Sequence, residues 1–402
     1  MLYRRAYMIY LDHAATTAVA PEVLEEMLPY FCEQYGNPST MYSLGTRNKK
    51  AVNEGKRQLA GMLGAGMEEI YFTSGGTESD NWAIRGVAEG YAHKGRHIIT
   101  TRIEHHGVLH PCRYLEKQGY RVTYLNVDKR GLISMEELRE AICPDTILIS
   151  VMFANNEVGT LQPIKEIGTL AREKGILFHT DAVQAFGHLD IQVKELGIDL
   201  LSASGHKING PQGIGFLYVN KEVKLPPLLY GGAQERGMRA GTENVPGIIG
   251  LVKAAQLWQE QRKMRLETER ELQVYLLQRL TGEIPHCIVN GDLNQRLSGN
   301  VHVSFPGIEG ESLLIMLDMK GICASSGSAC TTGARSPSHV LLAMGLTEQE
   351  ARGSLRLTLS WENTRRELDD TVEALKEIVE RLRSMSPEYG QYEKSLERGK
   401  IT

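Results

Sequence analysis

The stretch Ser204-Gly205-His206-Lys207-Ile208-Asn209-Gly210-Pro211 places a lysine between an apolar strand, 200–204, and a turn rich in Gly, Asn and Pro. This setting does not suit a solvated surface lysine. A desolvated amine at the edge of a sheet has a lowered pKa and forms Schiff bases. Asp181 follows another apolar strand, 176–180. A Schiff-base lysine together with an aspartate that faces a ring nitrogen is what pyridoxal phosphate requires of a protein.

Apolar strands alternate with amphipathic helices from about residue 65 to 220. The predicted strands are 70–73, 97–103, 121–127, 146–154, 176–180, 200–204 and 214–219, and the predicted helices are 78–94, 107–118, 135–142, 164–173 and 191–196. Strands connected through helices pair in parallel with right-handed crossovers, so we predict a layered α/β sheet. Ligands of such sheets bind outside the carboxyl ends of the strands, where Asp181 and Lys207 both fall.

The second half of the chain predicts a smaller α+β unit. Residues 244–282 are predicted to form one long helix. Its charged segment Gln259–Arg270 is expected to face solvent. The elements predicted after it are strands 300–305, 322–324 and 354–359 and helices 311–319, 337–343, 348–351 and 364–384. A chain of 402 residues suits two domains. We expect the tail from Pro387 to be loose because it is polar.

Composition excludes several classes of protein. The net charge is −4 with both signs interspersed, which does not indicate a nucleic-acid-binding surface. No apolar run approaches the ~20 residues that a membrane helix needs, and the N-terminus does not resemble a secretory signal. The six cysteines form no CxxC pair, so a disulfide framework or a zinc site is not expected. We therefore predict reduced thiols and a cytoplasmic protein without membrane or direct nucleic-acid contacts.

Further polar residues stand where strands end. Thr73–Glu78 contains a Gly-Gly turn that opens a helix, a setting that can bind a phosphate although most such turns are only turns. His105 follows the strand 97–103, where it could stack on a ring, move protons or simply make structural hydrogen bonds. The amides of Asn156 and Gln184 could bind a phenolate oxygen or cap loops.

Cys330 and Arg356 stand out in the second half. Cys330 lies in a run of small residues, 324–337, that cannot pack a core, and we expect a mobile loop that brings the thiol to a cofactor and then to a partner. The other cysteines are predicted to be buried structural residues: Cys32, Cys112, Cys143, Cys287 and Cys323. Arg356 lies inside an apolar strand and needs an anionic partner, either a substrate carboxylate or a structural ion pair.

Together these motifs closely resemble the cysteine desulfurases of the NifS/IscS type, fold-type I pyridoxal phosphate enzymes of the class-V aminotransferase family. The matching stretches are 10–17, 35–39, 72–78, 155–157, 179–184, 204–207, 235–242 and 326–330, in order over roughly residues 8–385. The resemblance implies a large domain, 8–257, with a seven-stranded, mostly parallel α/β/α sheet and a smaller α+β domain, 258–385. Residues 8–20 would pack on the small domain, and 386–402 would be a flexible tail.

The resemblance also implies roles for single residues. Lys207 would form the Schiff base, Asp181 would face the pyridinium nitrogen, and His105 would stack on the ring and transfer protons. The residues that would contact the phosphate or the phenolate oxygen are Gly76, Thr77, Asn156, Gln184, Ser204 and His206, with Thr242 contributed to the phosphate by the neighbouring subunit of a homodimer. Arg356 and Asn37 would hold the substrate carboxylate.

The implied reaction converts L-cysteine to L-alanine and leaves the sulfur on Cys330 as a persulfide. The acceptor would be an iron–sulfur scaffold protein or a tRNA thiolation enzyme, and the sequence does not choose between them. It also leaves open whether Cys330 briefly ligates an iron–sulfur cluster; no other metal ligand is predicted. The alternatives are a selenocysteine lyase, an aminotransferase of the same fold type, or a scaffold that binds the cofactor for stability alone.

Overall fold

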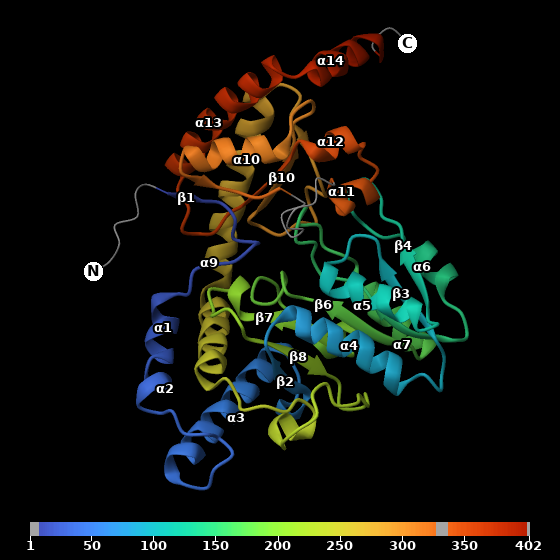
Figure 1. The fold of residues 1–402 in the computed structure, drawn as a ribbon, viewed down its shortest axis with the longest axis vertical. Coiled ribbons are helices and arrows are strands. Elements are labelled where there is room, and N and C mark those ends of the chain that lie inside the picture. Colours follow the sequence, from blue (N-terminus) through green and yellow to red (C-terminus); the bar gives the residue numbers. More distant parts are fainter. Residues whose placement is uncertain (1–7, 327–336, 400–402) are drawn as a thin grey trace.

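The computed structural model describes residues 8–326 and 337–399, with side chains to residue 394. Figure 1 shows a larger part built on an open sheet and a smaller part above it, with the long helix α9 (Val245–Glu283) running through both. Within the described ranges we find no helix with the length and apolar run needed to cross a bilayer.

A seven-stranded sheet with the order β2-β8-β7-β6-β5-β3-β4 forms the centre of the larger part. Its strands are β2 (Ile70–Thr73), β3 (His97–Thr101), β4 (Arg121–Leu125), β5 (Thr146–Ser150), β6 (Leu177–Asp181), β7 (Leu200–Ser204) and β8 (Gly215–Val219). β8 runs antiparallel to both of its neighbours. The connection 205–214 between β7 and β8 is too short for the helical crossover that parallel pairing needs. The predicted, mostly parallel α/β sheet is confirmed.

Helices cover both faces of this sheet, because neighbouring strand residues point to opposite sides. Ile98 lies in the core under α4 (Gly76–Gly90) and α5 (His106–Lys117). Ile99 lies in the opposite core, under α3 (Ser43–Leu63), α7 (Ile164–Lys174) and the first half of α9. The short elements of this part are α1 (Pro21–Met27), α2 (Pro29–Cys32), α6 (Met135–Ala141), α8 (Val193–Leu196), η1 (Met67–Glu69), η2 (Gly205–Lys207) and η3 (Gln234–Gly237).

The smaller part has an antiparallel sheet of β12 (Ser354–Thr358), β10 (Asn300–Ser304) and β9 (Ile288–Val289). Its core also takes side chains from the second half of α9. Its helices are α10 (Gly310–Met319), α11 (His339–Ala343), α12 (Glu348–Arg352) and α13 (Arg365–Ser384). The N-terminal strand β1 (Ile9–Tyr10) pairs in parallel with β11 (Ile322–Cys323), which brings the first described residues to this part. The domain boundary at residue 257 stays a prediction.

The long helix α9 was predicted, but its charged segment Gln259–Arg270 is partly buried. Arg265 and Glu269 are both buried, so the expectation for Gln259–Arg270 is wrong at these two positions. The Arg265 guanidinium lies 4.9 Å from the ring centroid of Trp258 and 3.6 Å from that of Trp361. The Glu269 carboxylate accepts a hydrogen bond from the Ser298 hydroxyl. Both charges are covered because α9 contributes to the cores of both parts.

The expectation of a loose tail after Pro387 is also wrong, because helix α14 (Pro387–Gly399) forms there. Its first turn is attached to the smaller part through Tyr389. The Tyr389 hydroxyl lies 2.9 Å from Nδ1 of His286, and the Arg383 guanidinium lies 4.4 Å from the tyrosine ring centroid. Aromatic and cation–π contacts of this kind stabilise a polar segment that has few apolar residues to bury.

Candidate active site

Loops at the carboxyl edge of the seven-stranded sheet bring the predicted residues together. β6 ends at Asp181, β7 leads into η2 with Lys207, and His105 follows β3. β6 and β7 are adjacent, and β5 lies between β3 and β6. Because these strands run in the same direction, their carboxyl ends meet at one edge, where ligands of open α/β sheets bind.

Lys207 is half-buried and points at the N-terminal segment. Its Nζ donates hydrogen bonds to the carbonyl oxygens of Ala14 and Ala15, both at 2.6 Å. The backbone N–H of Thr17 donates to the carbonyl of His206 at 2.9 Å, which holds the same segment against η2. The amine therefore lies at the edge of the sheet, as the sequence predicted, with two carbonyl acceptors orienting it.

Asp181 is buried, and its Oδ1 accepts a hydrogen bond from the backbone N–H of Val183 at 2.9 Å. Burial raises its pKa, against the opposing effect of His105, that hydrogen bond and Lys207. A carboxylate in this environment is stabilised by a nearby cation, such as a protonated ring nitrogen.

His105 is the N-cap residue of α5, where its Nδ1 accepts a hydrogen bond from the Gly107 N–H at 3.0 Å. Burial lowers the pKa of its imidazole, and Lys207 acts in the same direction while Asp181 opposes it. The ring is therefore neutral near pH 7, which suits a group that stacks on another ring or accepts a proton.

The Gly-Gly turn forms a cup between β2 and the N-terminus of α4. Gly75 has φ +151°, a conformation that favours glycine. A side chain at Gly76 would clash with Val183, because a Cβ there would lie 2.4 Å from Val183 Cγ2. Thr77 follows in the first turn of a helix whose free N–H groups favour anions.

Ser204 faces this turn from the end of β7, and His206 lies in η2 directly after it. Ser204 is buried, and its hydroxyl lies 3.7 Å from where a Cβ of Gly75 would be. The His206 imidazole lies within 3.1 Å of the Thr16 hydroxyl, and burial together with Lys207 lowers its pKa to about 4. The turn also meets charged groups, because the Ser74 N–H donates to Glu78 at 3.1 Å and Glu78 pairs with Arg239 at 2.8 Å.

Gln184 contacts the N-terminal segment through its side-chain amide, whereas Asn156 contacts Arg356 through its backbone carbonyl. The Gln184 side chain donates to the Ala14 carbonyl at 3.0 Å, the same oxygen that Lys207 contacts. The carbonyl of Asn156 accepts a hydrogen bond from Nη1 of Arg356 at 2.9 Å. Their proposed contacts to a phenolate oxygen stay predictions.

Arg356 makes the structural ion pair that was one of its two predicted roles. It is 4% exposed, and its Nη2 lies 2.8 Å from Oδ1 of Asp12. Its Nε is buried and has no hydrogen-bond partner among the described residues. The guanidinium thus keeps its Nε–H for a further acceptor.

Two other predicted site residues, Asn37 and Thr242, are not brought together with Lys207, Asp181 and His105. The Asn37 side chain accepts a hydrogen bond from the Ser39 N–H at 2.9 Å, and no hydrogen bond among the described residues joins it to Arg356. Thr242 is exposed in the segment before α9. An exposed threonine is accessible to a second subunit, which is the role predicted for it.

Cys330 lies outside the described residues, in the segment 327–336. The chain on both sides of that segment is bound at the site. Before it, the Ser325 hydroxyl donates to Oδ2 of Asp12 at 2.7 Å. After it, the Ser338 hydroxyl donates to Glu157, and Nε2 of His339 lies 3.0 Å from the Glu104 carbonyl oxygen.

The described cysteines form no disulfide. Cys112 is buried as predicted, and Cys143, Cys287 and Cys323 are half-buried. Cys32 is exposed, so its predicted burial is wrong. It ends the short helix α2, which has no buried residue.

Three buried acids at the site were missed by the sequence analysis: Asp80, Glu104 and Glu157. Burial raises the pKa of Glu104 to about 8 and that of Glu157 to about 7. Asp80 could have been found, because it shares one face of a helix with the apolar residues three, four and seven positions later: Ala83, Ile84 and Val87. An acid on an apolar face requires a partner or a proton.

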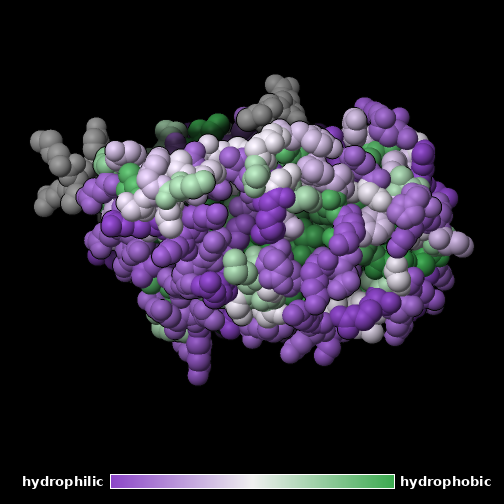
Figure 2. Space-filling model, turned by 90° about the horizontal axis from the view of Figure 1, so that it is seen from below, coloured by the Kyte–Doolittle hydropathy of each residue, from purple (hydrophilic) through white to green (hydrophobic). Residues whose placement is uncertain are grey.

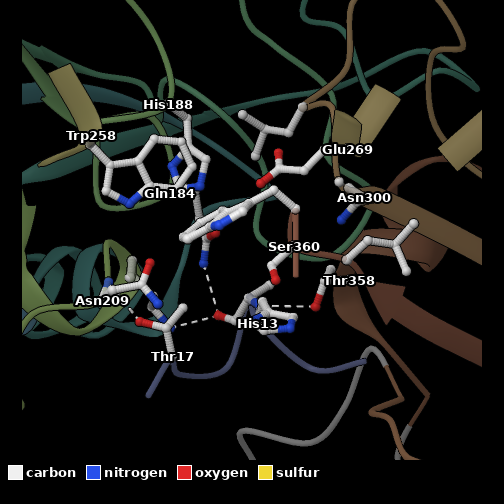
Figure 3. A pocket seen from close by; sticks show the side chains of 16 residues that line it. His13, Thr17, Gln184, His188, Asn209, Trp258, Glu269, Asn300, Thr358 and Ser360 are labelled. Carbon is white, nitrogen blue, oxygen red and sulfur yellow. Dashed lines mark hydrogen bonds between the residues drawn. The ribbon is translucent and has the colours of Figure 1, made fainter. Parts of the chain in front are cut away.

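A small cavity lies beside the N-terminal segment, and Lys207 is among the residues that line it. Figure 3 shows this cavity from close by. Its volume of about 40 Å³ has room for a few water molecules. His13, His188 and Trp258 line it, together with Glu269 from the second half of α9. Burial lowers the pKa of both histidines to about 4. The cavity wall is therefore polar but has no histidine cation, which suits neutral, hydrogen-bonding contents.

Comparisons with known proteins identify the family of the chain. The profile of the family "Aminotransferase class-V" matches residues 9–371. The cysteine desulfurase IscS of Methanosarcina thermophila is 56% identical over 379 residues, 94% of each chain. The IscS of Clostridium botulinum is 52% identical over 391 residues, 97% of this chain and 98% of that protein. The solved structure of a NifS-like protein superposes with a TM-score of 0.88 at 38% identity, covering 94% of this chain and 100% of the other.

The chain therefore belongs to the class-V aminotransferase family, whose members depend on pyridoxal phosphate. Within this family it is a cysteine desulfurase of the NifS/IscS type, as the sequence motifs predicted.

We expect Asp12→Ala to reduce the free energy of unfolding by about 3–5 kcal/mol, because it leaves the Arg356 guanidinium buried without its counter-ion. Urea denaturation followed by fluorescence measures this loss. The matched control is Glu377→Ala, which removes the acid of a surface pair in which Lys320 is 37% and Glu377 is 67% exposed, and which should leave the free energy of unfolding nearly unchanged. Equal losses in the two variants would contradict a buried, structurally important pair.

Proposed function

We propose that this chain binds pyridoxal phosphate and converts L-cysteine to L-alanine, with Cys330 receiving the sulfur as a persulfide. The observation that carries the proposal is the meeting of Lys207, Asp181 and His105 at one edge of the sheet, with both ends of the Cys330-containing segment bound beside them. Asp80, His105 and Asp181 have donor atoms within 4.8 Å of one another.

The residues present fit the cofactor. Asp181 is a buried acid suited to a protonated ring nitrogen, and the flat imidazole of His105 lies beside it. The turn at Gly75 and Gly76 leads into the N-terminus of α4, whose free N–H groups favour an anion. Lys207 would hold the cofactor covalently, and the proposed phosphate contacts are those of Gly76, Thr77, Ser204 and His206. When bound, the cofactor supplies an electron sink for the pair left at the substrate α-carbon.

The residues of the chain would manage the protons. The Lys207 amine and the neutral His105 imidazole would accept the α-proton and return protons to form alanine. Asp181 keeps its negative charge opposite the ring nitrogen, which keeps that nitrogen protonated. Asn156 and Gln184 would donate to the phenolate oxygen, provided that Gln184 gives up its bond to the Ala14 carbonyl.

Arg356 would bind the substrate carboxylate, with Asn37 as the second predicted contact. Its unpartnered Nε–H supports this role, since a carboxylate can accept from it. Asp12 already occupies one edge of the guanidinium. Substrate would therefore either share the guanidinium with Asp12 or replace it.

The proposed sulfur transfer conserves atoms and electrons. The Cys330 thiolate attacks the sulfur of bound cysteine, an S–S bond forms, and the Cβ–S bond of the substrate breaks with its electron pair passing to the carbon skeleton. Protons then complete L-alanine, so cysteine plus thiol gives alanine plus persulfide without an external oxidant. A thiol titrates near ~8.5, so the site must favour the thiolate for rapid attack.

The persulfide would pass to an acceptor protein, either an iron–sulfur scaffold or a tRNA thiolation enzyme. Its terminal sulfur is accessible only if the segment 327–336 can present it outside the site. Incubating the persulfide form with each candidate acceptor, and following labelled sulfur, would identify the acceptor. Retention of all label on this chain would contradict a donor role.

We expect Lys207→Ala to abolish the visible absorbance of the bound cofactor's imine and to reduce alanine formation to background, because no other amine replaces the covalent anchor. Absorption spectra of the purified protein test this. The control is Lys56→Ala, which removes a buried lysine paired with Glu235 and should keep the visible band. Persistence of the band in Lys207→Ala would refute the assignment.

The variant Cys330→Ser distinguishes a cysteine desulfurase from the alternative enzymes of the same fold type. We expect the variant to keep the cofactor band and to lose alanine release from L-cysteine in the presence of a reductant, since a hydroxyl is not a sulfur acceptor. The control Cys32→Ser removes an exposed thiol and should leave turnover unchanged. Undiminished turnover in Cys330→Ser would contradict the persulfide step and favour a selenocysteine lyase or an aminotransferase.

We further propose a homodimer in which Thr242 completes the phosphate site of the partner. Large apolar side chains are exposed in and after α2, including Phe31 at 55% and Met41 at 98%, and Tyr230 in the segment before η3 is 81% exposed. Figure 2 shows green, hydrophobic areas among hydrophilic ones on the face seen from below. Apolar surface of this kind is typical of a protein interface.

Subunit mixing tests the shared site. In a hybrid of Lys207→Ala and Thr242→Ala subunits, one site has both Lys207 and the partner's Thr242, so we expect mixing to restore cofactor affinity at that site. Thr242→Ala alone should weaken affinity on the order of tenfold, as expected for a hydrogen bond to a charged group. If mixing restores nothing, Thr242 acts within its own subunit or not at all.

A further inference from the structure

A second buried carboxyl lies directly beside Asp181. Asp80 on α4 is 1% exposed, and one of its oxygens lies within 4.8 Å of both an Asp181 oxygen and a His105 ring nitrogen. The first turn of α5 closes over it, because a Cβ at Gly107 would lie 2.8 Å from Oδ2 of Asp80. Neither the proton steps nor the phosphate contacts proposed above use this side chain.

The groups that face Asp80 do not supply a cation to neutralise it. His179 on β6 lies 3.7 Å away, from its Nε2 to Oδ1. That imidazole is held between the hydroxyls of Ser150 at 2.8 Å and Ser202 at 3.1 Å, and burial lowers its pKa to about 3, so it stays neutral. The remaining titratable neighbours are Asp181, Glu104 and His105.

Two carboxylates that share a buried site do not both ionise readily. Burial and the charge of Asp181 raise the pKa of Asp80 well above its usual range, although a hydrogen bond with Ser202 acts against the shift. Of the two acids, Asp181 has the better support for a negative charge, because the Val183 N–H and the Lys207 amine favour its ionised form. Oδ1 of Asp80 has no hydrogen-bond partner among the described residues.

We infer that Asp80 is a positioning residue that keeps its proton and donates a hydrogen bond to the Asp181 carboxylate. The inference rests on the proposed function, since Asp181 matters to the reaction only through the ring nitrogen. Asp181 would then be held from two sides, by the Val183 N–H and by the Asp80 hydroxyl. The pair would present one negative charge to one ring cation.

A pair of substitutions of similar shape tests this role. Asp80→Asn is neutral and keeps an N–H donor, whereas Asp80→Leu is neutral and has none. Glu89→Leu, on the exposed side of the same helix, is the control for an acid-to-leucine change on α4. The measurements are the affinity of each apoprotein for pyridoxal phosphate and the pH midpoint of the bound cofactor's visible band. An infrared difference spectrum between wild-type apoprotein and Asp80→Asn at neutral pH reports the protonated carboxyl directly.

We expect Asp80→Asn and Glu89→Leu to keep the wild-type affinity and midpoint. Asp80→Leu should bind the cofactor on the order of tenfold more weakly, with a shifted midpoint, because a hydrogen bond to a charged group is lost. The infrared difference should show the loss of one protonated carboxyl band. This last measurement needs no cofactor and holds even if Asp80→Leu does not fold.

Three results would overturn the inference: an Asn variant as impaired as the Leu variant, a Leu variant indistinguishable from wild type, or no protonated carboxyl lost in Asp80→Asn. Failure of the proposed function would look different, since wild-type protein itself would then form no visible band and release no alanine. The two failures are therefore separable, one in the wild type and one only in the comparison of variants.

Discussion

The ion pair between Asp12 and Arg356 connects the parts from which the site is assembled. Arg356 comes from β12 in the smaller part, and it also binds the Asn156 carbonyl in the loop after β5. Asp12 also accepts from Ser325, where the chain leads into residues 327–336. Two residues beyond Asp12, the Ala14 carbonyl orients Lys207. A buried charge is costly without its partner, so this pair constrains the N-terminal segment, the smaller part and the anchor lysine together.

The electrostatics of the site follow from how many acids are buried there. Burial raises the pKa values of Asp80, Asp181 and Glu104, while His105 and His179 are held neutral. Such a site has a surplus of acids over cations in the protein itself. A ligand that brings a positive ring nitrogen to Asp181 would relieve this imbalance, and that is the physical reason for the cofactor proposal.

The sequence predicted the central sheet well because strand and helix periodicities are local properties. It failed where burial depends on distant segments. Arg265 and Glu269 look like surface residues of a helix, yet Trp258, Trp361 and Ser298 cover them. The tail looked loose, yet Tyr389 packs against His286 and Arg383. Cys32 looked like a core residue, but its helix buries nothing.

The family, the order of strands and helices, and the position of Lys207, Asp181 and His105 at strand ends could all be predicted from the sequence, because they depend on local pattern and recognisable motifs. What each polar group faces could be learned only from the folded chain. It paired Arg356 with Asp12, turned Gln184 to the Ala14 carbonyl, and set Asp80 beside Asp181. These residues are far apart in the chain, and their hydrogen bonds and charge interactions act over a few ångströms, so only the fold brings them within range.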